Sequence, residues 1–178
     1  MKAMSRIRFT LLVAFLLTGV KCFGQKSKEK CISVWNSQMA KPDNPFTIDL
    51  RTVDFSTFAE IDSVCFEKVV SGTRIGVSYP FSRYDYRLYK RLDSSVFLVG
   101  LEGGAGGVER YCALVEAEKN SVRMVAKLAG DCSFEFLDLA RVDIKGRTVK
   151  VKKLKRRIDC DSGELVAEDS LGGFEVVF

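Results

Sequence analysis

The sequence predicts an all-β protein, an antiparallel β-sandwich or β-barrel built from consecutive hairpins, that follows an N-terminal signal peptide. Three observations lead to this prediction. Apolar and polar residues alternate with period two through most of the chain, as at Phe46, Ile48 and Leu50, which is the pattern of a strand with one buried face. Turn-forming pairs such as Ser71-Gly72 and Lys145-Gly146 separate these runs. No stretch keeps apolar residues at helical spacing for three turns.

The amino-terminal segment 1–24 is expected to be the signal peptide. It opens with three cations, and residues 9–20 form an uncharged run rich in Leu, Val and Phe. This run is shorter than the roughly 20 apolar residues that span a bilayer. Small side chains at Cys22 and Gly24 suit a peptidase that cuts after Gly24, with an uncleaved anchor or a lipid-modified Cys22 as alternatives. We therefore expect an exported protein, periplasmic or extracellular, with a single β-rich domain at 25–178.

The elements of that domain are predicted to be strands, apart from one or two helical turns at 56–61 with Ser56 as their cap. The predicted strands cover residues 46–50, 64–70, 75–79, 84–88, 96–101, 108–117, 121–128, 132–144, 147–158, 164–168 and 173–178.

One hairpin is predicted in detail, between the strands 132–144 and 147–158. With Lys145-Gly146 as its two-residue turn, apolar residues of the two arms face each other. The second arm then changes phase, which predicts a β-bulge at Lys152-Lys153. Beyond that bulge Cys132 faces Cys160, so we expect a disulfide between them.

The histidine and cysteine counts limit the chemistry. The chain has no histidine, which excludes Ser-His-Asp triads, Cys-His dyads and His-ligated metal sites. Five of the six cysteines lie in 25–178, and none forms a C-x-x-C pair. In an oxidising compartment they favour disulfides over metal, with at least one thiol left free or paired between chains. We expect no metal and no cofactor.

Charge is the strongest local signal. The chain carries a formal net charge of +5, but residues 1–24 hold four cations and no acid. Within the predicted mature chain, residues 141–157 carry +8 and the remainder −7. Such a stretch is able to bind an anionic lipid, a glycan or an acidic protein surface, whereas nucleic acid is not expected. The alternative is that lysines on an edge strand prevent aggregation. The candidate anion-binding residues are Arg147, Lys150, Lys152, Lys153 and Lys155.

A second candidate surface is aromatic. Tyr84, Tyr86 and Tyr89 alternate with cations in the segment 79–91, and rings beside cations suit the stacking of a sugar or peptide ligand. The alternative is core packing, because tyrosine is common in half-buried strands.

The function expected from these observations is that of an exported, non-enzymatic binding protein. Carboxylates are plentiful, but no recognisable catalytic motif is present, so enzymatic activity is not favoured. Two alternatives stay open. The alternating final strand 173–178 with its terminal aromatic resembles the ends of small outer-membrane β-barrels, and the glycine-rich loop 102–107 suits a secreted inhibitor or structural partner.

Overall fold

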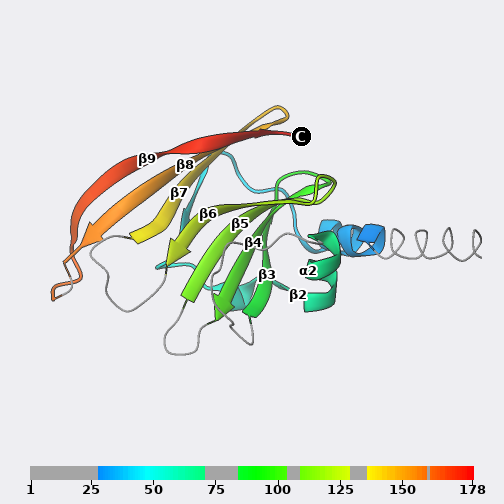
Figure 1. The fold of residues 1–178 in the computed structure, drawn as a ribbon, viewed down its shortest axis with the longest axis horizontal. Coiled ribbons are helices and arrows are strands. Elements are labelled where there is room, and N and C mark those ends of the chain that lie inside the picture. The colour runs from blue at the N-terminus through cyan, green and yellow to red at the C-terminus, as the bar shows by residue number, and fades with distance from the viewer. Residues whose placement is uncertain (1–27, 71–83, 104–108, 129–135, 160) are drawn as a thin grey trace, which may run out of the picture.

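The strands of the protein form two antiparallel sheets that pack together (Figure 1). The computed structural model describes residues 28–70, 84–103, 109–128, 136–159 and 161–178. In chain order the elements are a helix over residues 28–38, β1 (Phe46–Asp49), the 3-10 helix η1 (Phe55–Thr57), β2 (Ala59–Ile61), α2 (Ser63–Val69), β3 (Tyr84–Arg91), β4 (Val96–Gly103), β5 (Glu109–Glu116), β6 (Ser121–Leu128), β7 (Phe136–Lys145), β8 (Thr148–Ile158) and β9 (Leu165–Val177).

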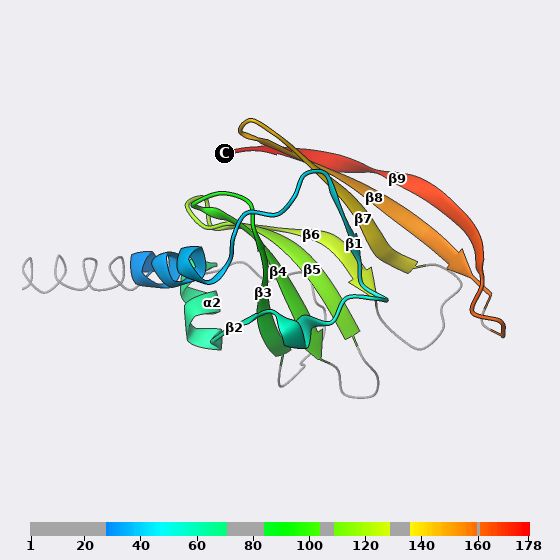
Figure 2. The same cartoon turned by 180° about the vertical axis from the view of Figure 1, so that it is seen from behind.

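The strand order is β2-β3-β4-β5-β6-β7-β8-β9, with β1 added beside β7 (Figure 2). Sheet A contains β1, β7, β8 and β9, and sheet B contains β2 to β6. The two sheets are joined where Lys127 of β6 pairs with Leu137 of β7. The predicted all-β fold is therefore confirmed, and of the two architectures expected it is the sandwich.

Sheet B is buried on both faces, and this produces two cores. One core fills the space between the sheets, where Leu98 and Leu114 of sheet B meet Val142 of sheet A. The other lies between sheet B and the helices, where Trp35 packs edge-on against Phe97 at 5.1 Å between ring centroids. The double burial explains why β4 and β5 contain continuous apolar runs instead of alternating ones.

The helical elements differ from the sequence predictions. Residues 64–70, predicted as a strand, belong to α2, and Asp62 caps that helix by accepting a hydrogen bond from the backbone N–H of Cys65 at 2.7 Å. Phe66 and Val69 are buried one turn apart, while Val64 is 55% exposed. The predicted helical turns at 56–61 are a 3-10 helix capped by Asp54, followed by β2.

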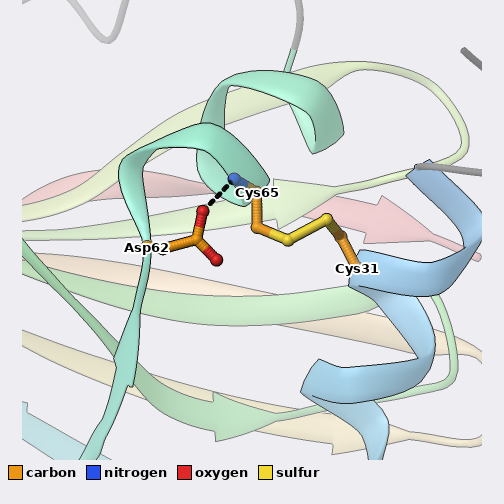
Figure 3. The surroundings of a disulfide bond; sticks show 3 residues. All are labelled: Cys31, Asp62 and Cys65. Carbon is orange, nitrogen blue, oxygen red and sulfur yellow. Dashed lines mark hydrogen bonds between the residues drawn. A yellow bond between two sulfur atoms is a disulfide. The ribbon is translucent and has the colours of Figure 1, made fainter.

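The helix over residues 28–38 was not predicted, and it is tied to α2 by a disulfide between Cys31 and Cys65 (Figure 3). Only Cys31 and Trp35, four residues apart, are buried on it. That stripe is too short for the periodicity to show in the sequence. No helix within the described residues is long and apolar enough to cross a membrane.

The β7–β8 hairpin forms as predicted, but in a different register. Its turn is Gly146-Arg147 instead of Lys145-Gly146, because Lys145 pairs with Thr148, and Gly146 supplies the positive φ of +60° that such a turn needs. Up to Lys152 the register differs by two residues, so these side chains keep their predicted faces, whereas Leu154 lies on the face opposite to the predicted one. Pairing is regular through Lys152-Lys153, where a bulge was predicted.

The irregularities lie in the strands on either side of β8. One is in β7 between Phe136 and Leu139, and two are in β9, which joins the two short strands predicted for this region into one. Extra residues at Val166 and at Leu171-Gly172 interrupt its pairing with β8, and Gly172 has a φ of +77°. Cys132 and Cys160 lie outside the described residues, so their predicted disulfide stays a prediction.

Candidate functional site

The candidate site lies on the outer face of sheet A, the side that points away from sheet B. Its central strand is β8, which pairs with β7 on one side and β9 on the other. The inward residues of β8 include Val149 and Val151, which belong to the core between the sheets. The residues that alternate with them point outward. Together with Arg141 of β7 these outward cations are called the basic face, which consists of Arg141, Lys150 and Lys152.

One row across this face is electrically balanced. The strand register places Lys150 between Asp143 of β7 and Glu175 of β9. The Nζ atom of Lys150 lies 3.1 Å from Oε2 of Glu175, and Asp143 pairs with Lys145 at 3.1 Å. Two acids and two cations therefore cancel here, and this row offers little net charge to a ligand.

The next row is not balanced. Arg141 lies directly opposite Lys152, and the residue opposite Lys152 on the other side is Gly173. Like charges that face each other across a strand pair are destabilising. Arg141 has one acid nearby, Glu168, with 3.5 Å between Nη2 and Oε1. This pair is exposed and long, so it compensates weakly.

Gly173 leaves this row open on the β9 side. A Cβ atom at this position would stand 1.9 Å from the carbonyl oxygen of Val151, so the close approach of β9 to β8 excludes any side chain. Lys152 has no ion-pair partner among the described residues. The row therefore presents two exposed cations beside bare backbone, an arrangement that is able to hold an anionic group.

The basic face does not continue along β8 toward the β8–β9 turn, because the next cations, Lys155 and Arg157, alternate to the opposite face of the strand from Lys152. Lys155 lies opposite Asp169, and Arg157 lies opposite Ala167. Arg157 is exposed, and within the described ranges it has no ion-pair partner.

Two of the predicted anion-binding residues are used elsewhere. Arg147 donates a hydrogen bond from Nε to the carbonyl oxygen of Phe178, and Lys153 lies over the ring of Phe174, 5.5 Å from its centroid. Arg141 was not among the predicted site residues. With the predicted turn it would face Lys150, and only the actual register brings it opposite Lys152.

The position of β8 also bears on the alternative explanation of its lysines. It is an interior strand of sheet A, so its lysines do not protect a sheet edge. Among the described strands the end of this sheet is β9, which carries no lysine or arginine and is interrupted by its two irregularities, another common way to blunt an edge.

The predicted aromatic surface is not assembled as one platform. Tyr86 stacks on Phe66 of α2, with 4.3 Å between ring centroids, and belongs to the core under the helices. Tyr89 is 7% exposed and packs between the sheets against Phe55 and Phe58. An irregularity of β3 between Leu88 and Lys90 accompanies this change of face. The side chain of Tyr84 lies outside the described part of the chain.

Arg156 lies on the same side of β8 as Lys152, four residues further along the strand, and belongs to a separate charge network. It donates to both carboxylate oxygens of Asp138, at 2.8 and 2.7 Å, and to both of Asp49, at 2.9 and 2.6 Å. Arg51 donates to Asp138 as well, at 2.9 Å. Burial disfavours the charged forms, but these hydrogen bonds outweigh it: the pKa of Asp49 lies below its usual value, and the pKa of Arg156 lies above its own. The network is satisfied internally and is structural.

A pocket of about 540 Å³ lies elsewhere, beside the helix over residues 28–38. It is lined by Lys28, Glu29, Ile32, Ser33, Asn36 and Glu118. Its two acids outnumber its one lysine, which already donates to Asn120, so this pocket does not suit an anion. Within the described ranges, no group of three or more Cys, Asp and Glu side chains is placed to hold a metal ion.

Comparisons of this chain with protein-family models, with curated proteins and with solved structures found no match.

Proposed function

We propose that this protein is an exported binding protein, without catalytic activity of its own, whose basic face holds an anionic ligand. The observation that carries the proposal is the row of Arg141 and Lys152, which face each other on the exposed side of sheet A beside Gly173. This like-charge pair is unfavourable in the free protein. An anion between the two side chains would relieve the repulsion.

Export is part of the same proposal, and two features support it. The segment 1–24 has the layout of a signal peptide. The disulfide between Cys31 and Cys65 is of the kind that persists in oxidising compartments. If the segment is removed, intact-mass measurement of secreted protein finds a chain that begins at Gln25; a chain that keeps residues 1–24 contradicts this part of the proposal.

The binding test compares two substitutions on the same strand. The double variant Arg141→Gln/Lys152→Gln removes the unbalanced row, while Lys150→Gln removes a lysine that Glu175 already neutralises. Binding is measured by titration calorimetry at low and high salt against phosphatidylglycerol vesicles, a sulfated polysaccharide and an acidic protein. We expect at least one probe to bind in a salt-dependent way.

For that probe the double variant should lose about tenfold in affinity, since two charged contacts of up to about 1 kcal/mol each are lost. Lys150→Gln should lose less than about threefold. The proposal is wrong if no anionic probe binds, or if the double variant binds every probe as tightly as the wild type.

A further inference from the structure

One row of residues crosses four strands on the outer face of sheet A. Arg141 of β7 stands in the row with Thr47 of β1 opposite it on one side and Lys152 of β8 on the other. Gly173 of β9 ends the row beyond Lys152. Thr47, Arg141 and Lys152 are all exposed. The row therefore offers a hydroxyl, a guanidinium and an ammonium group from three neighbouring strands, whose backbones together span roughly 10 Å.

Acidic side chains confine the attraction of an anion to this row. Toward the β7–β8 turn, the next outward row contains Asp143 and Glu175 on either side of Lys150. In the other direction lie Asp49 of β1, two residues beyond Thr47, and Glu168 of β9. A ligand that spreads over several rows, such as a membrane surface, meets these acids as well as the cations. The row instead suits one compact anionic group.

The charge of the row favours a group with two negative charges. Arg141 and Lys152 face each other, and the acid near Arg141 is the weakly compensating Glu168. A carboxylate or another singly charged group leaves one of the two cations uncompensated, whereas a doubly charged group matches both. A phosphate monoester carries about −1.5 to −2 charges at pH 7.

The three donors of the row also match the shape of a phosphate group. A phosphate monoester has three strong acceptor oxygens, while a carboxylate has two. A guanidinium binds phosphate at two points, and an ammonium group binds it as a point charge. The hydroxyl of Thr47 is a third kind of donor, from the strand on the other side of Arg141.

We infer that this row binds the phosphate group of a small phosphate monoester, with Arg141 and Lys152 matching its two charges and Thr47 donating a hydrogen bond to it. The inference rests on the proposed anion-binding function and specifies the chemical class of the ligand. The organic part of the ligand has room over Gly173, where the close approach of β9 to β8 excludes a side chain.

The first test compares a phosphate with a sulfate ester at two pH values. Titration calorimetry measures the binding of phenyl phosphate and phenyl sulfate to the purified protein at pH 7 and pH 5. A phosphate monoester has its second pKa at about 6, so phenyl phosphate should lose about tenfold in affinity at pH 5. Phenyl sulfate keeps one charge throughout, and should bind more weakly at pH 7 and change little with pH.

The sulfate ester is also the control for titration of the protein itself. The chain has no histidine, the side chain whose charge ordinarily changes in this pH range. The inference is overturned if phenyl sulfate binds as tightly as phenyl phosphate at pH 7, or if the two esters respond equally to pH.

Substitutions at Thr47 test the third contact. Thr47→Val removes the hydroxyl and keeps the shape, so it should lower the affinity for phenyl phosphate by about fivefold. Thr47→Ser keeps the hydroxyl and should bind like the wild type. The matched control is Lys150→Gln, which removes a neighbouring lysine that Glu175 already neutralises. Equal binding by Thr47→Val and the wild type would contradict the role given to Thr47.

Vesicles that contain phosphatidic acid present the same chemical group on a membrane surface. At equal phosphate concentration they should bind more weakly than phenyl phosphate, because the surface also meets Asp143 and Glu175. Stronger binding by the vesicles would overturn the assignment to a small ligand.

Failure of the inference is distinguishable from failure of the proposed function. If phenyl phosphate does not bind, but Arg141→Gln/Lys152→Gln weakens the binding of another anionic probe, the basic face binds anions of a different class. If that variant weakens the binding of no probe, the basic face itself is not the site.

Discussion

The guanidinium of Arg156 and the carboxylate of Asp138 form a two-point contact inside sheet A, with Nε 2.8 Å from Oδ1 and Nη2 2.7 Å from Oδ2. Asp138 is fully buried. It sits where β7 contains an extra residue relative to β8, between Phe136 and Leu139. The extra residue disturbs the strand alternation at the position where the Asp138 carboxylate is buried, so the irregularity and the ion pair occur at the same place.

Removing one partner of this pair should lower the free energy of unfolding more than replacing both partners by apolar residues. Asp138→Ala is expected to lower the free energy of unfolding by about 3 kcal/mol, because Arg156 and Arg51 lose a buried counter-charge. The double variant Asp138→Leu/Arg156→Met should be more stable than Asp138→Ala, since apolar side chains need no partner. Urea unfolding followed by circular dichroism measures both, with Lys150→Gln as an exposed control. A double variant less stable than Asp138→Ala contradicts this account.

Asp49 should make stability depend on acid pH. Its pKa in the folded protein is lowered from the usual 3.8, since hydrogen bonds from Arg156 and the backbone of Arg51 outweigh the effect of burial. A lowered folded-state pKa stabilises the protein above the unfolded pKa, and this contribution is lost as pH falls through the folded value. The stability difference between wild type and Asp49→Asn is therefore expected to be constant from about pH 7 to 5 and to shrink below about pH 4. Urea unfolding at several pH values measures it; a constant difference down to about pH 2 would exclude Asp49 as the source.

The sequence predicted the fold class well because most strands have one apolar side, and period two shows this directly. β1 and the β7–β8 hairpin are examples, with Ile48, Val142 and Val149 all buried as the alternation requires. The missed elements are those for which periodicity is weak. The helix over residues 28–38 buries only Cys31 and Trp35.

The candidate site was predicted as a charged region but not as an arrangement. Charge density located 141–157, and alternation gave the correct face of the side chains up to Lys152, whereas the bulge predicted at Lys152-Lys153 gave the wrong face for Leu154. The pairing of Arg141 with Lys152 depends on register, and the register depends on whether Gly146 is the first or the second residue of the turn. Both choices keep the apolar residues together, so hydrophobic patterning does not separate them. The positive φ of Gly146 is the feature that distinguishes the two turns.

Breaking the disulfide between Cys31 and Cys65 should loosen the helix over residues 28–38. The link closes a separation of 34 residues, for which the chain-entropy relation gives a stabilisation of about 3–4 kcal/mol. The variant Cys31→Ser/Cys65→Ser is expected to lose most of this free energy of unfolding. Trp35, the single tryptophan, is 1% exposed against Phe97, so its fluorescence reports the release of the helix. Unchanged urea midpoints by fluorescence and by circular dichroism would show that the link is not stabilising.

A second disulfide, between Cys132 and Cys160, is the prediction from the hairpin sequence. Proteolysis under non-reducing conditions followed by mass spectrometry should find two linked peptide pairs, Cys31 with Cys65 and Cys132 with Cys160. The Cys31→Ser/Cys65→Ser variant serves as the control, because it should keep the second pair alone. A peptide with Cys132 free, or joined to any other cysteine, rejects the prediction.

Cys112 should be inert in the folded protein. It is fully buried between the two sheets and is the free cysteine among the described residues. Burial raises the pKa of its thiol well above the usual value of 9.0, and because the thiolate is the reactive form, the thiol is both unionised and inaccessible. Ellman's reagent should therefore label the wild type and Cys112→Ala equally under native conditions. In denaturant the wild type should give one thiol more than Cys112→Ala. If the Cys112→Ala substitution lowers the number of thiols labelled under native conditions, the space between the sheets opens to solvent.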